Sequence, residues 1–218
     1  MLVCILLNRG EQALTWMRQE ERALPMFKSF TEIQTDIAER LGAAVKNRNL
    51  PMHSPVVATA DADARVMVLR AFDAGAWTLR FHTDLRSPKC GVIGTGAPVG
   101  VLFYDKPEKV QIRVHGVGRI EHDTPLADAA WEESTNFAKR CYLGDGPGVA
   151  SVDTTSGLPE WAKGIQPTDE QVAPARDNFA ILLIELHELD WFHLANSGHI
   201  RAQFSRESEG WEGRWVSP

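Results

Sequence analysis

The chain has 218 residues, of which 44% are hydrophobic and 24% charged, so it can bury the core of an ordinary globular protein. Its formal net charge of −6 excludes the global positive field that draws proteins to nucleic acids or anionic membranes, and any anion site must be local. Cys4, Cys90 and Cys141 lie far apart without metal-ligand spacing, which argues against a disulfide framework or a metal site and favours a cytoplasmic protein.

The first 25 residues differ in character from the rest of the chain. The opening MLVCILL lacks a basic segment and is too short to span a membrane, so neither a signal peptide nor a membrane anchor is expected. A polar, helix-favouring stretch then ends at Pro25. It is either a short docking helix or an optional leader, and we favour the leader. Residues 26–218 are expected to form a single domain.

An amphipathic helix is predicted from Thr31 to Arg48, with Thr31 as its N-cap. Its aliphatic residues recur at every fourth position and its opposite face is polar, as in a surface helix packed on a core. These aliphatic residues are Ile33, Ile37, Leu41 and Val45. We therefore expect a structural role for this helix.

After Pro51 the hydrophobic pattern changes to alternation, which is typical of strands. Residues 55–61, 64–72 and 76–84 predict three strands in an antiparallel meander, because only short turns separate them. Further strand-like segments are 98–105, 109–122, 179–194, 199–204 and 211–216. In the segment 109–122 the alternation places Gln111 on the polar face.

Thr124 followed by Pro125 predicts the start of a helix over 123–143, and residues 144–176 read as a long surface loop. The predicted fold is mainly β, a small closed β-barrel with flanking helices, because closure removes exposed strand edges. A sandwich is the alternative. A doubly wound parallel sheet is not expected, since no crossover helices separate the strands between 55 and 84.

The stretch RFHTDLRSPK, residues 80–89, gathers cations and hydroxyls at the end of a predicted strand. Ser87 before Pro88 predicts an N-cap, and Ser87, Arg86 and Lys89 at a helix start would form a pocket for a phosphate monoester. The other interpretation is a capped helix with solvated cations.

Two arginines flank the neighbouring strand. Arg65 and Arg70, five residues apart, lie on opposite faces of a regular strand. They can grip one phosphate only if a bulge or a strand end intervenes, so separate roles are the simpler prediction.

Four ordered motifs carry a family resemblance. They are RVMVLR at 65–70, FHTDLRSPK at 81–89, VQIRVHG at 110–116, and Trp191 followed by HIRAQF at 199–204. Together they resemble the pyridoxamine 5′-phosphate oxidase-like family of FMN-binding split barrels, over about residues 27–218 and closest to its divergent, oxidase-related branch. The resemblance implies a six-stranded antiparallel split barrel and a homodimer with FMN at the subunit interface.

The resemblance also implies residue roles. Arg65 and Lys89 match residues that meet the FMN phosphate. The remaining matches are Val68 and Leu69 along the flavin, His82 and Thr83 touching it, Gln111 bonded to its ring, and Trp191 near the cofactor. Trp191 could equally be a core aromatic.

Departures from the family pattern concern the substrate. Pro88 replaces a basic residue whose charge Arg86 could supply. Arg70 stands where a substrate-phosphate lysine is expected, and Gln203 where an arginine contacts FMN. The rest of that phosphate pocket has only unordered candidates, namely Arg140, Tyr142 and Ser134. Pyridoxamine phosphate as the substrate is therefore in doubt.

His199 and Arg201 match the pair that brackets the substrate, and we expect them to be the catalytic residues, with His199 able to move a proton near neutral pH. The chain is thus predicted to be an FMN-dependent oxidoreductase acting on a small molecule. The alternative is a non-catalytic flavin- or tetrapyrrole-binding protein. Glu185, Glu188 and Asp190 are expected to be solvated or paired rather than catalytic.

Overall fold

A nine-stranded antiparallel sheet forms the centre of the computed structural model, which describes residues 29–196 and 198–218. Its strands are β1 (Val56–Thr59), β2 (Ala64–Val66), β3 (Leu69–Asp73), β4 (Thr78–Asp84), β5 (Ala97–Asp105), β6 (Val110–Glu121), β7 (Phe179–His193), β8 (Ile200–Glu207) and β9 (Gly210–Trp215). The mainly β class with flanking helices is confirmed, with nine strands instead of six. The leader expected over residues 1–25 lies outside the described residues.

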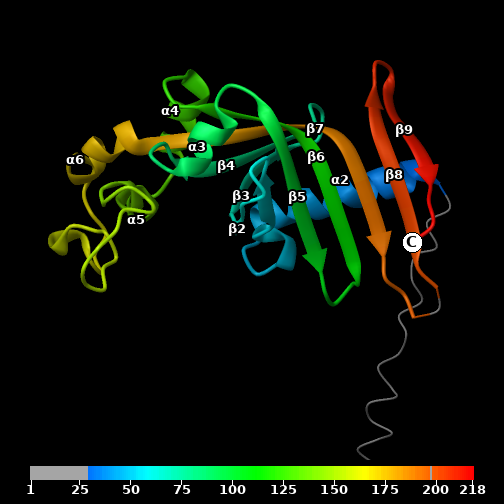
Figure 1. The fold of residues 1–218 in the computed structure, drawn as a ribbon, viewed down its shortest axis with the longest axis horizontal. Helices are drawn as coiled ribbons and strands as arrows, with labels where there is room; N and C mark the ends of the chain where they lie inside the picture. Colours follow the sequence, from blue (N-terminus) through cyan, green and yellow to red (C-terminus); the bar gives the residue numbers. More distant parts are fainter. Residues whose placement is uncertain (1–28, 197) are drawn as a thin grey trace, which may run out of the picture.

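Strands β6 and β7 form the spine of this sheet (Figure 1). One edge of β7 pairs with β6 along most of its length. The other edge pairs first with β4, over Phe179–Glu185, and then with β8, over Glu188–His193. β9 extends the sheet beyond β8. One long strand therefore serves both the barrel and a β8–β9 hairpin beside it.

The sheet curls because its two edge strands are consecutive in the chain. The strand order β2-β1-β5-β6-β7-β4-β3 ends on β2 and β3, which only Met67 and Val68 separate. The single strand predicted over 64–72 is thus wrong. The backbone N–H of Met67 donates to Pro55, at the start of the β1 region, and a second irregularity follows at Arg70. A split barrel results, with its core inside.

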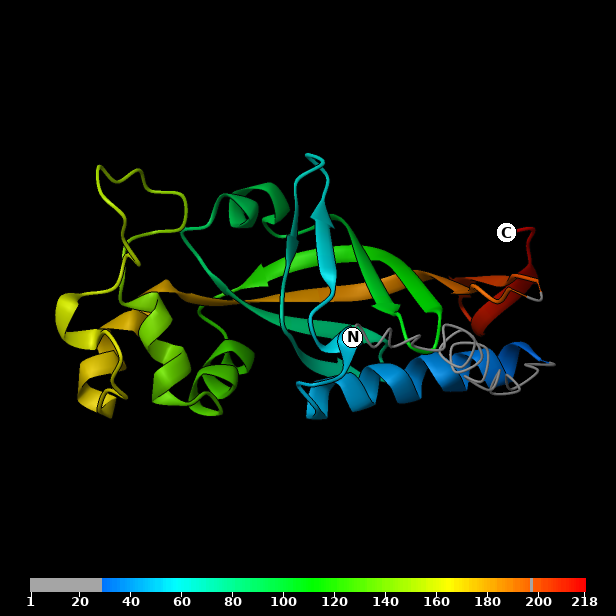
Figure 2. The ribbon, with the colours of Figure 1, turned by 90° about the horizontal axis from the view of Figure 1, so that it is seen from below.

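Helix α2 (Phe30–Lys46) covers this core from one side of the sheet (Figure 2). The predicted helix is confirmed, but its N-cap is Ser29 and not Thr31. Ser29 accepts a hydrogen bond from the N–H of Glu32, whose carboxylate accepts from the Ser29 N–H in return. This capping box satisfies two otherwise free donors, which Thr31 does not do.

A helical lobe lies at the end of the molecule opposite β8 and β9 (Figure 2). It contains α4 (Pro125–Glu132), α5 (Asn136–Lys139), α6 (Asp169–Val172) and the 3-10 turns η2 (Arg140–Tyr142), η3 (Glu160–Ala162) and η4 (Ala173–Asn178). Thr124 caps α4 as predicted, but the helix expected over 123–143 breaks after Glu132. The lobe has its own small core around Trp131 and Phe179.

A bulge between His115 and Gly116 sets the register of β6 on β7. A side-chain carbon on Gly116 would lie 2.0 Å from the carbonyl oxygen of Glu185, so only glycine allows the two backbones to approach this closely. Beyond the bulge, Arg113 lies opposite Asp190. Two shorter helices complete the fold, η1 (Pro51–His53) and α3 (Pro88–Ile93). Within the two described ranges, no helix is long and apolar enough to cross a membrane.

Candidate functional site

Two of the predicted phosphate-binding cations lie close together. The ammonium of Lys89 donates to the Ser87 hydroxyl at 2.7 Å. Burial lowers the pKa of Lys89, and the positive charge of nearby Arg65 lowers it further. Arg65 itself donates to the Thr59 hydroxyl at 2.9 Å and pairs with the exposed Asp63. We call Arg65, Ser87 and Lys89 the inner cation group.

Lys89 differs from most half-buried cations because no carboxylate within the described residues forms an ion pair with it. Desolvating a positive charge costs free energy unless an anion compensates it. The repulsion from Arg65 adds to that cost. A half-buried lysine beside an arginine, with only a hydroxyl to hold it, is the arrangement expected where an external anion binds.

Helix α3 starts at Pro88, as predicted, but Ser87 does not cap it with its side chain. The Ser87 hydroxyl instead accepts from Lys89, which leaves its own proton free to donate. The helix has only six residues, so its dipole adds little to the attraction of an anion. Side chains, not the helix end, provide the positive charge at this place.

Arg86 is directed away from the inner cation group. Its Nε and Nη2 donate to the two carboxylate oxygens of Asp84, at 2.9 and 2.6 Å. Its Nη1 donates to the carbonyl of Gly144 at 2.9 Å, at the start of the long loop. We expected Arg86 to supply charge to a phosphate. Its guanidinium instead links the start of this loop to the end of β4.

His82 and Thr83 point to opposite faces of β4, as neighbours on a strand must. Thr83 is buried, 3.7 Å from the thiol of Cys90 in α3. The His82 ring packs edge-on against Phe179 at 5.0 Å, and its Nε2 is buried without a hydrogen-bond partner among the described residues. Burial lowers the pKa of His82 to about 3, so the ring is neutral at physiological pH.

The three predicted residues at the β2–β3 break and the start of β3 lie in different surroundings. Leu69 belongs to the barrel core, whereas Val68 is half-buried in the break between the strands. Arg70 is exposed at the irregularity in β3, where its charge acts on His82 and on Tyr142. Arg65 thus acts on Lys89, and Arg70 acts on His82 and Tyr142, which agrees with the prediction of separate roles.

Of the three candidates for completing a substrate pocket, only Tyr142 lies near Arg70, and burial raises its pKa. Arg140 donates to the carbonyls of Ala162 and Ile165, and Ser134 donates to the carbonyl of Ala130. These last two side chains hold the lobe together.

A second cluster lies on the outer face of the sheet, across β6, β7 and β8. Asp190 is its centre. Its Oδ2 accepts from Arg113 Nη2 at 2.6 Å, from Arg201 Nη2 at 2.6 Å and from Gln203 Nε2 at 3.0 Å, and its Oδ1 accepts from Arg201 Nε at 3.0 Å. We call Gln111, Arg113, Asp190, Arg201 and Gln203 the outer-face group.

Asp190 is only 7% exposed. Desolvation opposes its ionisation, but the hydrogen bonds from Arg201, Gln203 and Arg113 outweigh it and lower the pKa of Asp190 below its ordinary value. The carboxylate therefore stays charged at neutral pH. Asp190 was expected to be solvated or paired rather than catalytic, and in the structure it is paired.

Trp191 and Phe192 also point to opposite faces. Trp191 is fully buried in the barrel core, and its indole donates to Asp36 of α2 at 3.0 Å. Phe192 lies on the outer face, where the register places it between Gln111 and Arg201. His199 packs edge-on against the Phe192 ring at 5.5 Å. Phe192 is not among the residues predicted from the sequence, although strand alternation beside Trp191 is a signal for it.

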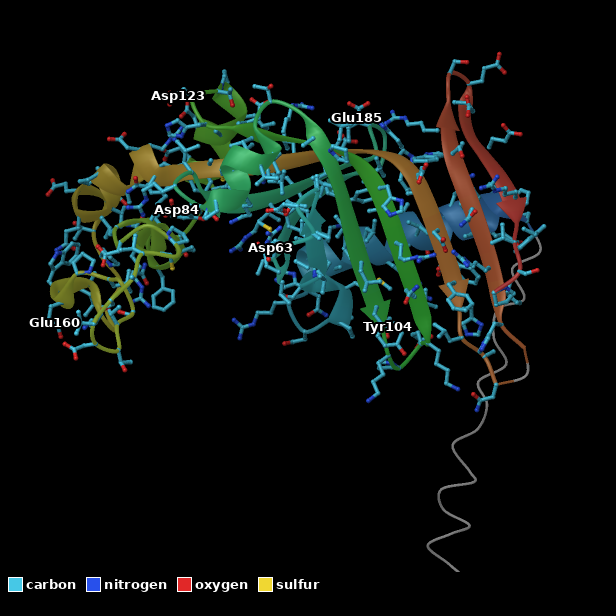
Figure 3. The ribbon with its side chains drawn as sticks, in the orientation of Figure 1. Asp63, Asp84, Tyr104, Asp123, Glu160 and Glu185 are labelled. Atoms are coloured by element: carbon cyan, nitrogen blue, oxygen red, sulfur yellow. The ribbon has the colours of Figure 1, made fainter. Side chains whose placement is uncertain are left out.

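The two groups lie on opposite faces of the sheet. Arg65 pairs with Val57, whose side chain is in the core, whereas Gln111 pairs with the exposed Tyr104. Strands β1 and β5 separate β2 from β6, which is about 14 Å of sheet. Figure 3 labels Asp63, near the first group, and Tyr104, near the second. The sheet therefore lies between Arg65 and the outer-face group of the same protomer.

One protein-family model matches part of this chain. The family model described as pyridoxamine 5′-phosphate oxidase, FMN-binding domain, matches residues 34–122, which run from α2 to the end of β6. This segment carries the inner cation group, Gln111 and Arg113. Over this segment the chain is similar to the FMN-binding domain of the pyridoxamine 5′-phosphate oxidase family. No curated protein sequence matches it significantly.

Solved structures extend the likeness beyond this segment. A pyridoxamine 5′-phosphate oxidase-related, FMN-binding protein from Nostoc punctiforme matches with a TM-score of 0.64 at 18% identity, over 90% of this chain and 100% of its own. PhzG from Burkholderia lata, in complex with tetrahydrophenazine-1-carboxylic acid, matches with a TM-score of 0.54 at 15% identity, over 84% of this chain and 92% of its own. At these identities the likeness shows the split-barrel fold.

Proposed function

We propose that this chain binds FMN and uses it for oxidation or reduction of a small molecule. The observation that carries the proposal is the inner cation group, in which Lys89 is half-buried beside Arg65 without a carboxylate partner in the described chain. A phosphate monoester supplies the negative charge that Lys89 lacks, and its further oxygens can accept from Arg65, whose present carboxylate partner is the exposed Asp63. The family match over 34–122 supports FMN as the molecule that carries the phosphate.

The residues present fit such a ligand. Lys89, Arg65 and the free proton of Ser87 would hold the phosphate. On the outer face, the side-chain amide of Gln111 forms no hydrogen bond within the described part of the chain, and Arg113 Nε is buried without a partner there. Unsatisfied donors of this kind suit the polar edge of a flavin ring.

The separation of the two groups supports a homodimer. If one FMN uses both groups, the phosphate is held by one protomer and the ring by the outer-face group of its partner, because the sheet lies between the groups of a single protomer. The exposed apolar side chains Val66, Leu102 and Tyr104 on the same outer face give such an interface apolar area to bury.

FMN supplies hydride acceptance and release when it is bound. The protein would orient the ring through Gln111 and place Arg201 beside it. His199, which is exposed next to Phe192, would move a proton between the substrate and water. Phe192 offers an aromatic surface for a planar substrate.

The exposed free thiol of Cys141 favours a reducing, cytoplasmic setting.

Purified protein tests the proposal directly. We expect a yellow preparation that releases FMN. An added electron donor should reduce the bound flavin and remove its colour, and air should then reoxidise the flavin and restore the colour. The double variant Arg65→Ala/Lys89→Ala should bind FMN about 100-fold more weakly, because two charge-assisted contacts are lost. A matched control, Arg48→Ala/Lys106→Ala, removes two exposed cations elsewhere.

Three results would count against the proposal. Unchanged FMN affinity in Arg65→Ala/Lys89→Ala would show that these residues do not bind the phosphate. A colourless protein without affinity for FMN would exclude the cofactor. A protein that binds FMN but that no donor reduces would be a flavin-binding module without turnover.

A further inference from the structure

We propose that Asp190 is a positioning residue, which fixes Arg113 and Arg201 as a single clamp for the polar edge of a planar ligand on the outer face. The identity of that ligand, FMN, rests on the proposed function. The clamp itself rests on the contacts of Asp190 alone. We call Asp190, Arg113 and Arg201 the arginine clamp.

The geometry of Arg201 leaves it little freedom. Its Nε and Nη2 donate to the two different oxygens of Asp190, at 3.0 and 2.6 Å, which fixes the plane of the guanidinium as well as its position. Gln203 is fixed in turn, since its amide nitrogen donates to Asp190 and its oxygen accepts from Arg214 at 3.0 Å. The remaining guanidinium N–H groups of Arg201 form no hydrogen bond with residues 29–196 or 198–218 and can meet a ligand.

The charge of the arginine clamp limits the ligand. Two guanidinium groups and one carboxylate leave a single net positive charge. In the inner cation group, by contrast, Arg65 pairs only with the exposed Asp63, and Lys89 pairs with no carboxylate of the described residues. The arginine clamp therefore suits a neutral ring with hydrogen-bond acceptors, or a ring that gains one negative charge, and it suits a phosphate dianion less well.

The surroundings of the arginine clamp point to a planar ring. The register places Phe192 directly beside Arg201, and Gln111 on the other side of Phe192. The Arg201 guanidinium lies 5.9 Å from the Phe192 ring centre. An aromatic surface, an unpaired amide and two oriented guanidinium groups thus share one face, and Asp190 is the group that keeps the guanidinium groups there.

The test uses the full chain with the substitution Asp190→Asn. The amide keeps the size of the carboxylate but removes its charge and replaces one of its two acceptor oxygens by a donor. The four donors that now share these two oxygens then no longer all have an acceptor, and both arginines lose their counterion. Two controls are matched to it. Glu188→Gln removes the same charge from the same face of β7, at a side chain that is 64% exposed and pairs with His115. Val114→Ala weakens the opposite, core face of β6.

Two measurements are made on each protein below its melting temperature. The first is solvent exchange of the Arg201 Nε–H, followed by NMR of isotope-labelled protein without FMN. We expect a protected proton in the wild type and exchange at least about tenfold faster in Asp190→Asn. The second is FMN affinity, from quenching of flavin fluorescence. It should fall about tenfold in Asp190→Asn and stay within about twofold in both controls.

The two measurements separate the possible failures. An Arg201 Nε–H that exchanges freely in the wild type, or equally in Asp190→Asn, would show that Asp190 positions nothing. An unchanged FMN affinity in Asp190→Asn, with the wild type binding FMN, would overturn the role of the clamp in binding. Wild-type protein that binds no FMN would overturn the proposed function and the ligand assigned here, while the exchange rate would still decide whether the clamp exists.

Discussion

The inner cation group and the outer-face group are both clusters of positive charge in an acidic protein, yet they handle that charge in opposite ways. Lys89 is half-buried and, among the described residues, has only a hydroxyl as its hydrogen-bond partner, whereas Arg113 and Arg201 share the buried carboxylate of Asp190. An unpaired cation is ready for a ligand but costs stability, and a paired cation is held in place but has lost part of its charge. The contrast suggests that one group attracts the ligand and the other orients it.

The largest expected effect on stability comes from the outer-face group. Asp190→Asn should lower the free energy of unfolding by about 2 kcal/mol, because two partly exposed guanidinium groups lose their shared counterion. Urea denaturation at neutral pH measures it. Glu188→Gln, on the exposed neighbouring pair, should change it by less than about 0.5 kcal/mol. Equal effects of the two substitutions would remove the contrast between buried and exposed pairs.

The pH dependence of that loss has a definite sign. Folding lowers the pKa of Asp190, so its ionised form contributes stability above its unfolded pKa of about 3.9, and this contribution is lost as the pH falls through the folded value. The wild type and Asp190→Asn should therefore differ fully at neutral pH and converge in strong acid. A difference that stayed constant down to low pH would show that the charge of Asp190 is not its cause.

The sequence predicts the inner cation group better than the outer-face group for a physical reason. Ser87, Pro88 and Lys89 are neighbours in the chain, so a strand end followed by a helix start places them together. Arg113 and Asp190 are separated by 77 positions and meet only because the bulge at Gly116 shifts the register of β6 on β7. No local pattern reveals that shift.

Helix α2 shows the same limit on a smaller scale. Its four-residue periodicity predicts the helix and most of its buried face correctly. The predicted N-cap, Thr31, lies two residues after the observed one, because threonine is also a good N-cap residue. The pattern of serine at 29 and glutamate at 32 was a readable signal, since a capping box satisfies two backbone donors and a single threonine satisfies one.

A smaller change in the free energy of unfolding is expected for substitutions on the two faces of β7. Trp191→Phe keeps the ring in the barrel core but removes the hydrogen bond to Asp36, which should lower the free energy of unfolding by about 1 kcal/mol. FMN affinity should not change, because this side chain points away from the outer face. The matched variant Phe192→Leu should do the reverse, with weaker FMN binding and little loss of stability. An equal loss of FMN by Trp191→Phe would place Trp191 at the cofactor after all.

The smallest expected change in the free energy of unfolding is that of Lys89→Met, and it should be a gain in stability. Lys89→Met removes a half-buried cation that repels Arg65 and keeps the length of the side chain. In protein without FMN it should raise the free energy of unfolding by about 0.5 kcal/mol, because a desolvation cost disappears, as is common where a functional site is held in an unfavourable state. The same variant should bind FMN more weakly. Urea denaturation with and without FMN measures both effects, and Lys106→Met, at an exposed position, is the control. A clear loss of stability in FMN-free Lys89→Met would mean that Lys89 supports the fold, and the inner cation group would then no longer stand apart from the outer-face group.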